Sequence, residues 1–202
     1  MTSPKLKNLL GILCQRLSAE GVPHALMGAM ALALYGVPRY TADIDILSGQ
    51  KYKDVDVIKR LMADLGFDCF QETEAFAQFD SELGVYGKVD FMFVHTDDGM
   101  AMLERAILVN DDFWGEIPVI QPTDYAILKL MAIANNPARK THDMADLEAL
   151  FKTASADLLH PVFNPIDRSQ LKAFAKRFGV LEFLESVLPL LASNNKWDSP
   201  HA

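Results

Sequence analysis

Two aspartates, Asp43 and Asp45, lie two residues apart in the segment DIDIL. Side chains alternate along a β-strand, so a strand over residues 43–47 would direct both carboxylates to one face. Magnesium prefers oxygen ligands and is commonly held by carboxylates together with substrate phosphates. The pair is therefore a candidate cation site, although taken alone it favours the simpler alternative of an edge strand with solvated acids.

The segment before this pair has features of a phosphate-binding turn. Apolar residues 24–27 predict a short strand that ends in Gly28, and residues 29–35 predict a buried helix directly after it. The N-terminus of a helix attracts phosphate, and a glycine without Cβ lets the backbone approach closely. A plain strand-to-helix turn explains Gly28 by itself. The order of turn, helix, Arg39, Thr41 and acid pair favours a nucleotide site.

Residues 27–47, MGAMALALYGVPRYTADIDIL, resemble the nucleotidyltransferase signature of the DNA polymerase β superfamily. The portion GVPRYTADIDIL is most similar to the abortive-infection (AbiEii-type) and minimal nucleotidyltransferase toxins of bacteria. The family usually has Gly or Ser after the first glycine, where this sequence has Ala29, so a hydroxyl contact to phosphate is absent. The resemblance implies that Asp43 and Asp45 are catalytic metal ligands. It implies nucleotide binding by Gly28, Ala29, Arg39 and Thr41.

The family also requires a third carboxylate on a neighbouring strand. Asp90 is the best candidate because it opens the apolar strand predicted over residues 89–94; Asp80, Glu82 and Asp97 are alternatives. In the family the third acid orients or deprotonates the attacking hydroxyl, and the three acids together hold two Mg²⁺ ions, or Mn²⁺. Taken alone, Asp90 is equally consistent with a strand-end acid that caps a turn.

A second match lies in residues 123–151, which resemble the C-terminal half of the same toxin-like group. Lys129 interrupts an apolar helix, so it needs an anion or a route to solvent. We interpret Lys129, with Arg139, as a triphosphate contact, the alternative being an exposed helix face. Replacement of Lys129 by methionine is then expected to weaken triphosphate binding by about 1.5–3 kcal/mol and to leave stability unchanged or slightly higher.

Asp143 and Asp146 are three residues apart and share one face of the predicted helix. We interpret them as partners that position Lys129 or Arg139, and not as metal ligands. Asp146 is thereby included among the nucleotide-binding residues. A helix N-cap is the alternative for Asp143.

The elements that must position these residues change in kind near Gln121. Strands and helices interleave before it, and only helices are predicted after it, which indicates an α/β (α+β) fold with a small mixed nucleotidyltransferase sheet flanked by helices and followed by a C-terminal helical bundle. We expect an α/β domain over 1–121, a helical domain over 122–192 and a frayed tail over 193–202. Strands are predicted over 24–27, 43–47, 67–70, 89–94 and 116–120. Helices are predicted over 4–20, 29–35, 54–65, 99–109, 122–134, 143–151, 169–178 and 181–190.

Composition sets the remaining limits. The chain has 202 residues, of which 50% are hydrophobic, with a net charge of -8. The acidic balance disfavours duplex DNA as a partner. The longest apolar run, residues 25–36, is shorter than the ~20 residues that span a bilayer, so no membrane partner is expected. With no signal sequence evident, we expect a cytoplasmic protein in which Cys14 and Cys69 are buried thiols.

These observations together predict a metal-dependent nucleotidyltransferase. It would move a nucleoside monophosphate from a nucleoside triphosphate to an acceptor hydroxyl, with pyrophosphate leaving. The resemblance to the toxin group implies RNA, and a tRNA end in particular, as the acceptor, and a cognate antitoxin as a partner. A small-molecule transferase of the antibiotic-modifying kind and an inactive binding module are the alternatives. The cations Lys129, Arg139 and Lys140 favour RNA, whereas the net charge favours a small acceptor.

Overall fold

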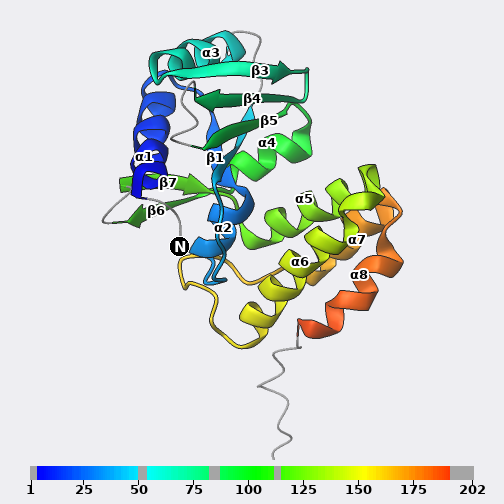
Figure 1. Cartoon of the computed structure of the whole chain (residues 1–202). Coiled ribbons are helices and arrows are strands. Elements are labelled where there is room, and N and C mark those ends of the chain that lie inside the picture. Colours follow the sequence, from blue (N-terminus) through cyan, green and yellow to red (C-terminus); the bar gives the residue numbers. More distant parts are fainter. Residues whose placement is uncertain (1–3, 50–53, 82–86, 112–114, 192–202) are drawn as a thin grey trace, which may run out of the picture. The chain divides into compact units, whose positions relative to one another are not determined.

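Within the residues that the computed structural model describes (4–49, 54–81, 87–111 and 115–191), seven strands form one mixed sheet. Its strand order is β3-β4-β5-β2-β1-β7-β6 (Figure 1). The strands are β1 (His24–Met27), β2 (Asp43–Gly49), β3 (Phe67–Glu72), β4 (Phe76–Ser81), β5 (Lys88–Val94), β6 (Ile107–Asp111) and β7 (Gly115–Val119). β2 pairs in parallel with β5, and β1 in parallel with β7, while the other pairs are antiparallel.

By its internal contacts the chain divides into two compact units. The first comprises Met1–Leu34 and Pro38–Gln121, and the second comprises residues 35–37 and Pro122–Ala202. The first unit contains the sheet with the helices α1 (Pro4–Ala19), α2 (Gly28–Leu34), α3 (Asp54–Asp64) and α4 (Asp97–Glu104).

Alternation along β2 and β5 separates a core face of the sheet from a polar face. Ile44, Ile46, Val89 and Phe91 are buried, whereas the aspartates between them are half-buried on the opposite face. Helix α4 covers the far half of this polar face. A Cβ added to its Gly99 would lie 2.5 Å from the Cβ of Val94. Val94 is four residues after Asp90 on β5, so both side chains are on the same face of the sheet. The acidic half of the face is therefore the half that α4 does not cover.

The second unit is helical. It contains α5 (Pro122–Asn135), the 3₁₀ turn η1 (Pro137–Arg139), α6 (Lys140–Ser155), α7 (Arg168–Phe178), α8 (Leu181–Val187) and the 3₁₀ turn η2 (Leu188–Leu190). Buried Tyr35 belongs to this unit, because its ring packs edge-on against Tyr125 and Phe163 at centroid distances of 5.7 and 4.8 Å. Asp167 caps α7 by accepting hydrogen bonds from the backbone N–H groups of Ser169 and Gln170.

The predicted fold class is confirmed, but two elements differ from the prediction. Residues 99–109 do not form one helix, because α4 ends at Glu104 and β6 begins at Ile107. Pairing of β6 with β7 overrides the apolar spacing that indicated a helix. Strand β4 was not predicted, although its burial alternates strictly along the strand.

The expectation of two buried thiols is wrong for one of them. Cys14 is buried and burial raises its pKa to about 12, whereas Cys69 is exposed. Cys69 lies on β3, the edge strand, where Phe67 alone is buried. Two further predictions, the alternative acid Glu82 and the tail over 193–202, lie outside the described residues. No helix in the described ranges has both the length and the hydropathy that a bilayer crossing requires.

Candidate active site

Three carboxylates share the polar face of the sheet where β2 meets β5. The parallel register places Asp45 directly opposite Asp90, and Asp43 opposite Lys88. Neighbouring strands lie about 4.8 Å apart, so the Asp45 and Asp90 side chains leave the sheet side by side. All three aspartates are half-buried. The arrangement gives a set of oxygen ligands of the kind that a divalent cation requires.

The other candidates for the third acid lie farther from the pair. Asp80 is on β4, one strand beyond β5, and faces Lys88 across the ladder. Asp97 lies in the first turn of α4. Among the candidates that the structure describes, Asp90 is therefore the one on the strand next to β2.

Gly28 lies against the carboxylate of Asp45. It follows β1 with φ of +67°, and its neighbour Met27 is in register with Asp45. A Cβ built at Gly28 would lie 2.0 Å from Oδ2 of Asp45, closer than any real contact allows. The site thus requires glycine here both for the backbone conformation and for the space that the carboxylate fills.

Thr41 fixes the start of β2. Its Oγ1 accepts a hydrogen bond from the N–H of Asp43 at 3.1 Å and lies 3.2 Å from the Asp43 carbonyl oxygen. Arg39 is half-buried in the segment between α2 and β2. The structure thus brings Gly28 against Asp45 and Thr41 against Asp43, while Ala29 follows Gly28 in α2 and Arg39 lies in the segment between α2 and β2.

The surroundings of Asp90 oppose its ionisation. Burial, and the nearby Asp43 charge, raise the pKa of Asp90, while a hydrogen bond from the Gln78 side chain and the charge of Lys88 act in the opposite direction. Oδ1 of Asp90 is buried without a hydrogen-bond partner. A buried carboxylate oxygen without a partner, beside two more carboxylates, fits a site that meets a cation or a substrate hydroxyl, because either contact would remove the cost of burying it.

Replacement of Asp90 by asparagine is expected to stabilise the metal-free protein at neutral pH. Because the folded state raises the Asp90 pKa, wild type loses stability as the pH rises through that folded-state pKa, and asparagine avoids the loss. We expect a higher Tm for Asp90→Asn than for wild type at pH 7. Below about pH 4 the gain should vanish.

Thermal unfolding with EDTA at both pH values measures this effect. Exposed Asp68 on β3 provides the control, because Asp68→Asn should change the Tm little at either pH. A lower Tm for Asp90→Asn at pH 7 would contradict the electrostatic description of the site.

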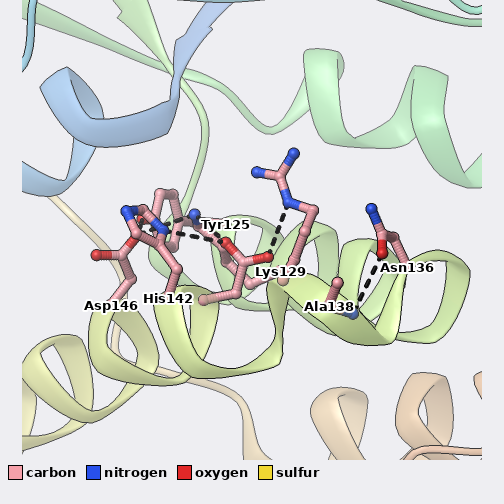
Figure 2. A network of polar contacts seen from close by, with 8 residues as sticks. Tyr125, Lys129, Asn136, Ala138, His142 and Asp146 are labelled. Carbon is pink, nitrogen blue, oxygen red and sulfur yellow. Dashed lines mark hydrogen bonds and ion pairs between the residues drawn. The ribbon is translucent and has the colours of Figure 1, made fainter.

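A second cluster lies within the helical unit, between α5 and α6 (Figure 2). Nζ of Lys129 is 2.7 Å from Asp143 Oδ1 and 2.8 Å from Asp146 Oδ2. Arg139 Nε donates to the other oxygen of Asp143 at 3.2 Å, and the Tyr125 hydroxyl donates to Asp146 at 3.3 Å. The Lys129 ammonium also lies 5.6 Å from the centroid of the Tyr125 ring. Two cations and two carboxylates thus balance one another in one network.

The contacts of this cluster exclude the simpler alternatives for Lys129 and Asp143, an exposed helix face and a helix N-cap. Lys129 is not on an exposed helix face, since its side chain is only 15% exposed. Asp143 is not an N-cap, because α6 begins at Lys140 and the buried Asp143 carboxylate binds Lys129 and Arg139 instead. The expected pairing of Asp143 and Asp146 with Lys129 and Arg139 is present.

His142, Asp143 and Asp146 bring their ligand atoms within 4.8 Å of one another, a spacing compatible with a metal ion. The Lys129 ammonium, however, already lies within hydrogen-bond distance of both carboxylates. A metal ion at this place would have to displace the Lys129 ammonium from both carboxylates. The contacts of this cluster offer Lys129 no other anion, so its buried charge would be left without a partner. The cluster is therefore an ion-pair network, and the carboxylates of the sheet fit a metal better.

Sequence reasoning missed two polar residues that these clusters use. Gln78 lies on the unpredicted strand β4, so no strand register pointed to it. Tyr125 precedes Lys129 by one helical turn, and that spacing was a usable signal.

Comparison with known proteins gives one family match that covers most of the chain. Residues 12–188 match the model of a family described as nucleotidyl transferase AbiEii toxin, Type IV TA system. This is the group that the sequence resembles, and the resemblance is confirmed. No curated protein sequence matches the chain.

Solved structures of nucleotidyltransferases have the same fold. An antigenic nucleotidyltransferase-like protein from Paracoccidioides brasiliensis matches with a TM-score of 0.54 at 16% identity, over 98% of this chain and 99% of that one. The ANT(2")-Ia complex with adenylyl-2"-tobramycin matches with a TM-score of 0.61 at 12% identity, over 85% and 98%. A putative nucleotidyltransferase from Thermotoga maritima matches with a TM-score of 0.50 at 23% identity, over 70% and 94%.

Proposed function

The chain belongs to the AbiEii nucleotidyl transferase toxin family and is a nucleotidyltransferase, and we propose that its activity depends on a divalent metal and has RNA as acceptor. The observation that carries the metal proposal is the register of Asp45 with Asp90, beside Gly28 and on the face that also bears Asp43. Asp43, Asp45 and Asp90 would hold two Mg²⁺ ions, or Mn²⁺. Bound there, the metal would neutralise charge on the triphosphate and on the leaving group.

The proposed reaction forms one P–O bond and breaks another. The acceptor hydroxyl oxygen bonds to the α-phosphorus, and the bond from the α-phosphorus to the bridging oxygen breaks, so that pyrophosphate leaves with the electron pair. Asp90 accepts the hydroxyl proton on its buried, unbonded Oδ1.

Nucleotide contacts are proposed for each unit taken by itself. Backbone N–H groups of Gly28 and Ala29 would donate to phosphate at the turn after β1. Arg39 would contact phosphate or brace the segment that leads into β2, and Thr41 keeps its observed role at the start of that strand. Arg139 is the exposed cation of the second cluster, with a side chain 57% exposed.

Lys129 and Asp146 contribute to nucleotide binding through the same network. Two of the three ammonium N–H groups of Lys129 face Asp143 and Asp146, which leaves one for a phosphate oxygen. The direct triphosphate contact of Lys129 is then a single hydrogen bond.

An RNA acceptor is supported by two lysines beside a half-buried aromatic ring on the helical unit. Lys140, Lys176, Phe178 and Phe183 are among the residues that line a groove of about 940 Å³. Lys140 Nζ lies 5.4 Å from the Phe183 ring centroid. Cations that follow phosphates, with an exposed ring that stacks on a base, are a usual means of binding single-stranded nucleic acid. The Phe183 ring is buried, so the half-buried Phe178 ring is the one of the two that could stack on a base.

A small-molecule acceptor is the second candidate. The shared fold with ANT(2")-Ia, an antibiotic-resistance factor, is the observation that favours it. The toxin family also implies an antitoxin partner, and we place both in the cytoplasm.

The acceptor can be identified directly. The full chain is incubated with each of the four α-³²P-labelled nucleoside triphosphates, Mg²⁺ and either total RNA or tobramycin. We expect label in material that ribonuclease degrades, and no label when EDTA is present. Label on tobramycin would favour the second candidate. Absence of transfer to either acceptor with Mg²⁺ or Mn²⁺ would contradict the proposed activity.

A further inference from the structure

We propose that Gln78 is a positioning residue for Asp90, holding one carboxylate oxygen so that the other stays available to the reacting hydroxyl. This inference rests on the proposed function of Asp90. Gln78 itself would not contact the substrate.

The first support is register. Gln78 on β4 lies directly opposite Asp90 on β5, and Asp90 lies directly opposite Asp45 on β2. The three side chains therefore form one row across three strands, on the polar face of the sheet. Their neighbours along β4, Ala77 and Phe79, face the core and are buried.

The second support is that the two carboxylate oxygens of Asp90 differ in their hydrogen bonding. The Gln78 side chain donates a hydrogen bond to the Asp90 carboxylate, while Oδ1 is buried and has no partner. One oxygen is tied to β4, and the other remains for the chemistry.

The third support is the chemistry of an amide in this place. A lysine would neutralise the carboxylate, and a glutamate would repel it, whereas a glutamine orients it and leaves its charge unchanged. Lys88, a cation on β5 like Asp90, is exposed. Its Nζ lies 5.2 Å from the centroid of the Phe70 ring on the edge strand β3. Among the contacts described for Asp90, the one that orients its carboxylate is therefore the hydrogen bond from Gln78.

Two variants test this role. Gln78→Leu removes the donor at similar size, and Gln78→Glu keeps the shape but loses the donor. We expect kcat to fall by about 10–100-fold in each, the range found for groups that orient a ligand. The dissociation constant of the magnesium–nucleotide complex, measured by calorimetry, should change less than about threefold, because Asp43, Asp45 and Gly28 remain.

Exposed Gln71 on β3 is the matched control, because it lies opposite Gln78 on the other side of β4. Gln71→Leu should leave kcat and nucleotide affinity unchanged. A positioning role also predicts that Gln78→Leu adds no further loss of kcat to Asp90→Ala. The Tm should fall more when Gln78→Leu is made in wild type than when it is made in Asp90→Ala.

The inference is overturned by a kcat within threefold of wild type in a folded Gln78 variant. Losses that add in the double variant, or a Tm cycle without coupling, also overturn it. If Gln78→Leu does not fold, Gln78→Glu decides by the same criteria. Absence of transfer by wild type would refute the proposed function instead, whereas an active wild type with unimpaired Gln78 variants refutes this inference alone.

Discussion

Gly28→Ala is expected to lower nucleotide transfer by at least about 100-fold, because an added methyl group displaces Asp45. The new Cβ would lie 2.0 Å from Oδ2, 2.5 Å from Cγ and 2.7 Å from Cβ of Asp45. The whole side chain must therefore move by more than a rotation of its end. A displacement near 1 Å at a reacting centre costs on the order of 10² in rate.

Gly66→Ala separates this clash from the backbone effect. Gly66 also has positive φ, +79°, but nothing lies within 4 Å of its added Cβ. Both variants pay for a left-handed alanine, about 1 kcal/mol, while only Gly28→Ala disturbs a carboxylate. Activity and urea unfolding are measured for both. Equal activity losses in the two variants would refute the placement of Asp45 against Gly28.

Lys129→Met is expected to destabilise the helical unit by about 3 kcal/mol. The substitution leaves the buried carboxylates of Asp143 and Asp146 without the ammonium that bridges them, and breaking a buried ion pair costs about 3–5 kcal/mol. The lower end of the range applies because Arg139 still binds Asp143. This result reverses the expectation from sequence that stability is unchanged or higher.

Lys152→Met is the matched control. Lys152 pairs with Glu148 one turn away on α6, with side chains 60% and 30% exposed, so its loss should cost less than about 0.5 kcal/mol. A variant that also carries Asp143→Asn and Asp146→Asn should recover part of the stability, because no buried charge is then left unpaired and the Arg139 side chain is 57% exposed. Urea unfolding measures all of them. Equal stability of Lys129→Met and wild type would contradict the buried network.

The sequence was sufficient for groups that act through local spacing. Asp43 and Asp45 share a face because side chains on a strand alternate, and Gly28 ends a strand before a helix; both features are readable in neighbouring residues. Asp90 was reached by the resemblance to a family. Its place opposite Asp45 depends on a pairing between strands that only the folded chain displays.

The sequence did not show which side chains far apart in the chain contact one another, or how deeply they are buried. Helical spacing did indicate Asp143 and Asp146 as partners of Lys129 or Arg139, but it did not show that both carboxylates are buried, which is what makes the Lys129 ammonium essential to stability. Gln78 was missed for the same reason, since its role depends on the register of β4 with β5. The predicted helix over 99–109 included residues 107–109 of β6, because the pairing of β6 with β7 is not encoded in their own spacing.

The central claim is that the three aspartates of the sheet support transfer of a nucleoside monophosphate. The most direct measurement compares α-³²P and γ-³²P nucleoside triphosphates with Mg²⁺ and the acceptor, using wild type and Asp45→Asn. We predict that wild type transfers only the α label, that the γ label is recovered in pyrophosphate, and that Asp45→Asn transfers neither. Transfer of the γ label to the acceptor, or equal transfer by Asp45→Asn, would contradict the claim.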